Sequence, residues 1–199
     1  MTSFGDIRIT TNRLILTTLR PEDAGELAGV LEDERLHEFI GGQPASRDEL
    51  RDRYRRLAAG SAKPNEVWLN WIVRQRDGWR PIGTVQATVV DHECGRHAHI
   101  AWVIGAPWQN QGFASEAAAA LVDWLRNHGV SVITAHIHPD HGASAKVAAS
   151  VGLELTNESV DGEQVWDMRR DQVTSNGPFE TGAARDVGTE PQASTCSGA

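Results

Sequence analysis

The stretch A-H-I-A-W-V-I-G-A-P-W-Q-N-Q-G-F-A-S-E, residues 98–116, decides the fold of this chain. Residues 98–104 follow the period-2 pattern of a strand. From Ala114 onward, apolar residues recur at helical spacing as far as Leu125, and Gly129 supplies a stop. The N-terminus of a helix leaves N–H groups unpaired and carries partial positive charge. The glycine-containing loop before it, residues 109–115, is therefore predicted to bind a phosphate group.

The other periodic segments predict a single α+β (mixed α/β) domain. Strands are expected at residues 13–18, 67–74, 82–90, 98–104, 131–138, 153–158 and 164–169. Helices are expected to begin at Pro21, at Ser46 and at Ala114, and to cover residues 143–151. Residues 171–199 contain no Leu, Ile, Met, Trp or Tyr and cannot bury enough apolar area to offset the entropy of ordering. We therefore expect a domain at residues 1–170 and a disordered C-terminal tail at residues 171–199.

Composition narrows the classes of function. The chain has 199 residues, of which 40% are hydrophobic, and a formal net charge of -8. This charge argues against nucleic-acid binding, which requires a basic patch. The longest apolar run, residues 117–122, is too short to span a membrane, and no secretory signal pattern is visible. The two cysteines, Cys94 and Cys196, suggest no disulfide framework, so we expect a cytoplasmic protein.

The hexapeptide Q-N-Q-G-F-A at residues 109–114 resembles the Q/R-x-x-G-x-G/A signature of the GNAT N-acetyltransferases. The continuation A-S-E-A is typical of the branch that includes ribosomal-protein N-terminal acetyltransferases. Further segments resemble the family in the right order: T-N-R-L-I-L at residues 11–16, P-I-G-T-V at residues 81–85, and the late helix that ends in V-G-L at residue 153. The resemblance implies a central, mostly antiparallel twisted sheet of about seven strands with about four helices.

The resemblance also implies an acetyl-CoA-dependent N-acetyltransferase that acts on a primary amine of unknown identity, as a monomer or homodimer and without a metal. The loop at residues 109–115 would then hold the pyrophosphate, and the strand before it would pair with the pantetheine arm. A backbone N–H near Val103 would polarise the thioester. The residues expected to bind the cofactor are Trp102, Val103, Ile104, Gln109, Asn110, Gln111, Gly112, Phe113, Ala114, Ser115, His141 and Ser144.

Candidate acid–base residues follow from the same comparison. His99 stands where the family branch often has a glutamate, and an imidazole with an ordinary pKa of ~6.5 can accept a proton at neutral pH. A satisfied strand histidine is the alternative reading of His99, and Glu93 is a second candidate base. The tyrosine that many family members carry on the late helix is replaced by Ala148. Ser144 is left to stabilise the thiolate, or else to cap that helix.

The acceptor site is expected to use the loop that contains His37 and Phe39, together with the aromatic side chains Trp68 and Trp102. Two other readings of the chain stay open. The run H-x-H-x-D-H at residues 136–141 resembles the zinc signature of metallo-β-lactamase-fold hydrolases, although no histidine follows it. The absent tyrosine is compatible with a non-catalytic acyl-CoA-binding or regulatory module.

Overall fold

The structure is a computed structural model in which residues 6–169 are described. The predicted tail at residues 171–199 lies outside the described residues, so its state remains a prediction. None of the helices within residues 6–169 is both long and apolar enough to cross a membrane.

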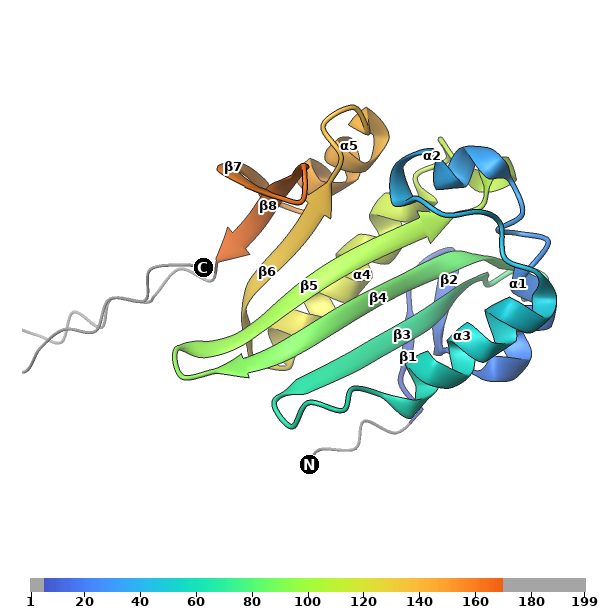
Figure 1. Cartoon of the computed structure of the whole chain (residues 1–199), viewed down its shortest axis with the longest axis horizontal. Helices are drawn as coiled ribbons and strands as arrows, with labels where there is room; N and C mark the ends of the chain where they lie inside the picture. Colours follow the sequence, from blue (N-terminus) through green and yellow to red (C-terminus); the bar gives the residue numbers. More distant parts are fainter. Residues whose placement is uncertain (1–5, 170–199) are drawn as a thin grey trace, which may run out of the picture. The chain divides into compact units, whose positions relative to one another are not determined.

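The described part of the chain is built on one eight-stranded sheet with the strand order β1-β2-β3-β4-β5-β6-β8-β7 (Figure 1). The strands are β1 (Arg8–Thr10), β2 (Leu14–Thr18), β3 (Glu66–Gln75), β4 (Pro81–His92), β5 (Gly95–Ile104), β6 (Val130–Ile137), β7 (Glu154–Val160) and β8 (Glu163–Arg169). All neighbouring strands are antiparallel except β5 and β6. The mostly antiparallel α+β fold is thus confirmed, with β1 as a strand that the sequence did not indicate.

The helices are η1 (Pro21–Asp23), α1 (Ala24–Leu27), η2 (Glu34–Leu36), α2 (His37–Ile40), α3 (Arg47–Ala59), η3 (Ala106–Trp108), α4 (Phe113–Asn127) and α5 (Gly142–Ser150), where η marks short 3-10 helices. The helix expected from Pro21 is only a short 3-10 turn followed by one turn of α-helix. The helix start expected at Ser46 is confirmed: Ser46 caps α3 in a capping box, in which the Ser46 and Glu49 side chains satisfy each other's backbone N–H groups. Ser144 lies within the first turn of α5, whose cap position is His141, so the capping role expected for Ser144 is wrong.

Two apolar cores lie on opposite faces of the sheet. The larger joins β2–β6 to the buried face of α4 through residues such as Trp71, Ile100 and Leu121. The smaller holds α1 and α3 against Ile72 on the other face. In Figure 1, α4 runs behind the sheet while α1 and α3 lie in front of it. The strands therefore present alternate residues to α4 and to the front face.

The parallel pairing of β5 with β6 stops part-way along the strands. Its register runs from Arg96↔Val130 to His99↔Thr134 and goes no further, although β5 continues to Ile104. Beyond that point the two strands diverge, as Figure 1 shows, and α5 follows the end of β6. Among the described residues, the second half of β5 is therefore paired with β4 along one edge and with no strand along the other.

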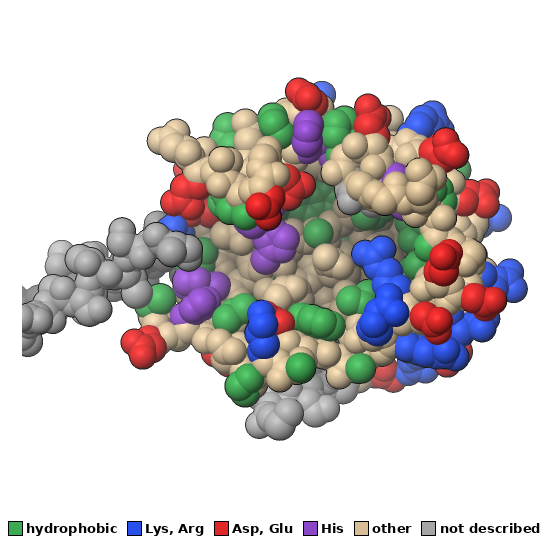
Figure 2. Space-filling model, in the orientation of Figure 1, with side chains coloured by type: hydrophobic (Ala, Val, Ile, Leu, Met, Phe, Trp, Pro, Cys, Tyr) green, Lys and Arg blue, Asp and Glu red, His purple; other side chains and the backbone are tan. Residues whose placement is uncertain are grey.

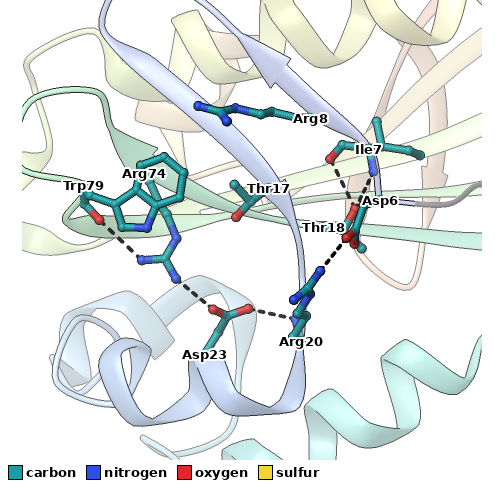
Figure 3. A pocket seen from close by; sticks show the side chains of 9 residues that line it. All are labelled: Asp6, Ile7, Arg8, Thr17, Thr18, Arg20, Asp23, Arg74 and Trp79. Carbon is teal, nitrogen blue, oxygen red and sulfur yellow. Dashed lines mark hydrogen bonds and ion pairs between the residues drawn. The ribbon is translucent and has the colours of Figure 1, made fainter.

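A buried guanidinium fixes the front helices to the sheet (Figure 3). Arg74 on β3 is 6% exposed, and its Nη2 donates to Asp23 Oδ1 at 2.7 Å while its Nη1 donates to Glu26 Oε2 at 2.6 Å. The other Asp23 oxygen accepts from the N–H of Arg20 at 2.8 Å. Arg74, Asp23 and Arg20 border a cavity of about 350 Å³ beside Trp79. The bonds set the position of η1 and α1, which form one wall of the front face.

We predict that Arg74→Met lowers the free energy of unfolding by about 3 kcal/mol, because it leaves the poorly exposed Asp23 carboxylate unpaired. Urea denaturation measures this loss. Arg55→Met is the matched control: it removes an exposed i,i+3 pair with Asp52 and should cost less than about 1 kcal/mol. Equal losses in the two variants would show that the Arg74 ion pair does not anchor the front helices.

Candidate functional site

The loop before α4 offers unpaired N–H groups at a helix N-terminus. Gly112 caps α4 with φ 80°, a left-handed conformation that favours glycine, and Asn110 also has a positive φ of 59°. The first hydrogen bond of the helix runs from the N–H of Glu116 to the carbonyl of Gly112 at 3.0 Å. The N–H groups of Phe113, Ala114 and Ser115 therefore have no acceptor within the helix. The turn has the free N–H groups that the predicted phosphate-binding loop requires, and phosphate binding there remains a prediction.

A contact across the sequence holds this turn in place. Glu116 Oε1 accepts from Thr11 Oγ1 at 2.6 Å and from the N–H of Arg13 at 2.9 Å, and Glu116 Oε2 accepts from Arg13 Nε at 2.6 Å. Arg13 also donates to the carbonyl of Gln111 at 3.0 Å and lies 4.5 Å from the Phe113 ring centroid. Although burial raises the pKa of Glu116, the hydrogen bonds from Thr11 and Arg13 outweigh it and hold that pKa below its usual value. Sequence reasoning did not identify Arg13 and Glu116 as a pair.

Two glutamines of the loop are occupied within it. Gln109 Nε2 donates to the carbonyl of Ile104 at 3.0 Å, and Gln111 Nε2 donates to the carbonyl of Pro107 at 3.0 Å. Their side-chain amides thus shape the turn between β5 and α4. A contribution of these two residues to ligand binding would come from their backbone groups.

The backbone of β5 has a free edge where β6 departs. The N–H of Gly105 donates to the carbonyl of Ile82 on β4. Because alternate residues of a strand bond to the same neighbour, the odd-numbered residues of β5 direct their N–H and carbonyl groups to β4. The carbonyl of Arg96, an even-numbered residue, accepts from the Ser131 hydroxyl on β6, which agrees with this alternation. Past His99, the even-numbered residues therefore direct their N–H groups to the diverging edge. The N–H of Val103 itself faces β4, so the N–H groups near Val103 that face the diverging edge are those of Trp102 and Ile104, and the thioester contact remains a prediction.

His99 lies where the two strands part. It is the last residue of the β5–β6 register, and its ring packs edge-on against His136 on β6 with centroids 4.4 Å apart. Its Nε2 is buried without a hydrogen-bond partner among the described residues. Burial, followed by the nearby His136, lowers the pKa of His99 to about 4. The imidazole is therefore neutral at pH 7 and able to accept a proton, but it holds that proton weakly.

The other acid–base candidates are Glu93 and Ser144, and they lie in different parts of the fold. Glu93 is exposed at the tip of the β4–β5 hairpin, six residues before His99. Six residues of strand span roughly 20 Å, so the structure does not bring Glu93 to the diverging strands. Ser144 is half-buried in the first turn of α5, beyond the end of β6. Ala148, in the position of the missing tyrosine, is fully buried.

The histidines of the 136–141 run pack on aromatic rings. His136 contacts His99, while Phe39 stacks on His141 at 4.4 Å and lies 5.5 Å from the ring of His138. Burial lowers the pKa of His141 below its usual value. Within residues 6–169 no three His, Cys, Asp or Glu side chains are grouped so that they could hold a metal. Phe39 and His141 instead join α2 to the turn before α5.

A second feature of the site is a cavity of about 220 Å³ on the front face, between α3 and the β3–β5 strands. Figure 2 shows the hollow in the middle of this face, with basic side chains at its edge beside α3. Of the predicted acceptor residues, His37 and Trp102 line the cavity, whereas Phe39 and Trp68 do not. Strand alternation and its contacts place the Trp102 indole against the α4 core, so its backbone faces the cavity.

Comparison with known proteins identifies the family. Residues 13–154 match the acetyltransferase (GNAT) domain. The chain belongs to the GNAT acetyltransferase family. A curated relative, the uncharacterized N-acetyltransferase p20 of Bacillus licheniformis, is 27% identical over 146 residues, which cover 72% of this chain and 80% of p20. The metallo-β-lactamase-fold alternative is wrong, because the histidine run occupies the end of a GNAT strand and the turn after it.

Solved structures share the fold at low sequence identity. The ribosomal L7/L12 α-N-protein acetyltransferase RimL, in complex with coenzyme A, superposes with a TM-score of 0.70 at 16% identity, covering 83% of this chain and 99% of RimL. The ribosomal-protein-S5-alanine acetyltransferase of Vibrio fischeri gives a TM-score of 0.67 at 16% identity, covering 84% and 98%. At these identities the likeness establishes the GNAT fold alone.

The buried His99 makes a prediction for stability against pH. Its pKa is about 4 in the folded chain and ~6.5 when unfolded, so its contribution is complete above pH 6.5 and is lost as the pH falls toward 4. Urea denaturation at pH 7.5 and pH 5 should show that His99→Gln removes about 2 kcal/mol of the pH-dependent loss. An identical loss in the variant would mean that His99 titrates normally in the folded protein.

Proposed function

We propose that this GNAT acetyltransferase is an acetyl-CoA-dependent N-acetyltransferase that transfers the acetyl group directly to a primary amine, of a small molecule or a protein N-terminus, in a ternary complex. The observation that supports this most strongly is the adjacency of two backbone features. The free N–H groups of the first turn of α4 follow directly on the unpaired edge of β5. Together they match a ligand that has phosphates at one end and a chain of amides behind them.

The residues present fit acetyl-CoA. The N–H groups of Phe113, Ala114 and Ser115, held by the Arg13–Glu116 pair, can bind the diphosphate. The free peptide groups of Trp102 and Ile104 can pair with the pantetheine amides as an added strand would. When bound, acetyl-CoA supplies the acetyl group and the thiolate leaving group.

The chemistry requires proton transfer at two positions. A bond forms between the acceptor nitrogen and the acetyl carbon, the bond from that carbon to sulfur breaks, and a proton leaves the nitrogen while one reaches the thiolate. His99 Nε2 has no other partner among the described residues and can accept the first proton, directly or through water. The Ser144 hydroxyl can stabilise the thiolate, because Ala148 leaves no phenol there.

The proposal also covers the location, the oligomeric state and the partners of the protein. A cytoplasmic location is consistent with the exposed free thiol of Cys94. We propose a monomer or homodimer that binds neither nucleic acid nor membrane, with acetyltransferase activity confined to residues 1–170. The non-catalytic acyl-CoA-binding module remains the second candidate, because the buried Ala148 cannot act as an acid.

The proposal is tested by thiol release from acetyl-CoA in the presence of a panel of primary amines. We expect amine-dependent release, and we expect Ser115→Asp to weaken acetyl-CoA binding by roughly tenfold or more, since it adds a negative charge beside the diphosphate. The same charge favours the helix N-terminus, so the variant should remain folded.

Asn127→Asp, which adds the same charge at the other end of α4, is the control and should leave the acetyl-CoA affinity unchanged. Calorimetry separates the two candidate functions. Acetyl-CoA binding without turnover of any amine would favour the module. Equal affinities in the Ser115→Asp and Asn127→Asp variants would remove the α4 N-terminus from the site.

A further inference from the structure

The charged side chains that line the front cavity are unusual for a site that binds an amine. Its described lining residues include several leucines and the neutral polar side chains Asn70, Thr84 and Gln86, but no Asp or Glu. Arg53 is the one Lys or Arg among them. A ligand with several ammonium groups would lose its water there and find no carboxylate in return.

Tyr54 contributes a buried hydroxyl that lacks a partner. The residue lines the cavity and is only 3% exposed, and its Oη makes no hydrogen bond within the described residues. Burial raises the pKa of this hydroxyl, so it stays protonated as a donor throughout the neutral range. A buried donor without an acceptor is costly, and an acceptor oxygen on a ligand would remove that cost.

Arg53 supplies a positive charge beside that hydroxyl. Two other arginines of α3, Arg51 and Arg55, pair with Asp48 and Asp52 on the same helix. Within residues 6–169 Arg53 makes no such pair. Its charge lowers the pKa of Tyr54, which burial and the Asp23 carboxylate raise. A cation and a hydroxyl donor together suit a carboxylate, which accepts hydrogen bonds from both.

We propose that the acceptor is a small amine that carries a carboxylate and an apolar body, as an apolar amino acid does. The carboxylate binds Arg53 and the Tyr54 hydroxyl, the apolar body contacts the leucines of α3 and of the 31–36 segment, and the amine faces β5. The volume of about 220 Å³ equals roughly seven water molecules, which suits a ligand of this size. The inference rests on the proposed N-acetyltransferase activity and names its substrate class.

The test compares amino acids with their decarboxylated counterparts: leucine with isoamylamine, methionine with 3-methylthiopropylamine, and phenylalanine with phenethylamine. Thiol release is measured at saturating acetyl-CoA, with leucinamide and spermidine as further acceptors. We expect at least one amino acid to exceed its decarboxylated counterpart in kcat/KM by roughly tenfold or more. Leucinamide, which lacks the negative charge of a carboxylate but keeps a carbonyl like that of a peptide, should be used less well than leucine.

Two variants assign the selectivity to residues. Arg53→Gln should raise KM for the preferred amino acid by roughly tenfold and leave KM for its decarboxylated counterpart within about twofold. Tyr54→Phe removes only the hydroxyl; it should raise the same KM without lowering the free energy of unfolding, because that hydroxyl makes no bond in the fold. Arg56→Gln, on the same helix but outside the cavity lining, is the matched control and should change neither KM.

The possible outcomes distinguish a failure of the proposed function from a failure of the carboxylate inference. If acetyl-CoA fails to bind in calorimetry, the proposed function is wrong. If acetyl-CoA binds but no amine of any kind is acetylated, the proposed N-acetyltransferase activity is wrong as well. If leucinamide, spermidine or the decarboxylated amines are acetylated in preference to the amino acids, the carboxylate inference alone is overturned. Selectivity that survives Arg53→Gln would likewise overturn it.

Discussion

The parting of β5 from β6 is the constraint on which the rest of the site depends. Up to His99 the two strands share a parallel ladder, and past it no strand of the described part of the chain lies beside the peptide groups of β5 on that side. A free strand edge inside a fold must find other partners, and the same strand leads within nine residues to the N-terminus of α4. Because β5 and β6 diverge, a strand edge with free peptide groups is followed along the chain by a turn that can bind an anion.

The two faces of β5 then divide the work. Residues that face α4, such as Ile100, hold the strand in the larger core, and Gly83 on β4 is required because a Cβ there would collide with the carbonyl oxygen of Val103. Residues on the other face, such as His99 and Ala101, are turned toward the front face of the sheet. Under the proposed function, backbone groups position the cofactor and side chains select the acceptor.

Some features of the fold and of the candidate site could be predicted from the sequence, and others could not. The loop before α4 was predictable, because its glycine and helix start are local in sequence. The Arg13–Glu116 contact was not, since it joins residues 103 positions apart and neither residue is unusual in its own segment. The choice of Trp102 and Ile104 over Val103 depends on which edge of β5 each peptide group faces, and hydrophobic alternation carries no information about that. The low pKa of His99 comes first from burial and then from His136 on β6, and the strand pattern of β5 reveals neither.

The most direct test of the central claim is the response of backbone amides to coenzyme A, observed by NMR on ¹⁵N-labelled protein. The account predicts that the largest shift changes fall on Phe113, Ala114 and Ser115 and, along the strand, on Trp102 and Ile104. The amide of Val103, bonded to β4, should change less. Large changes beside Arg74 and Trp79 with none in the first turn of α4 would contradict the account.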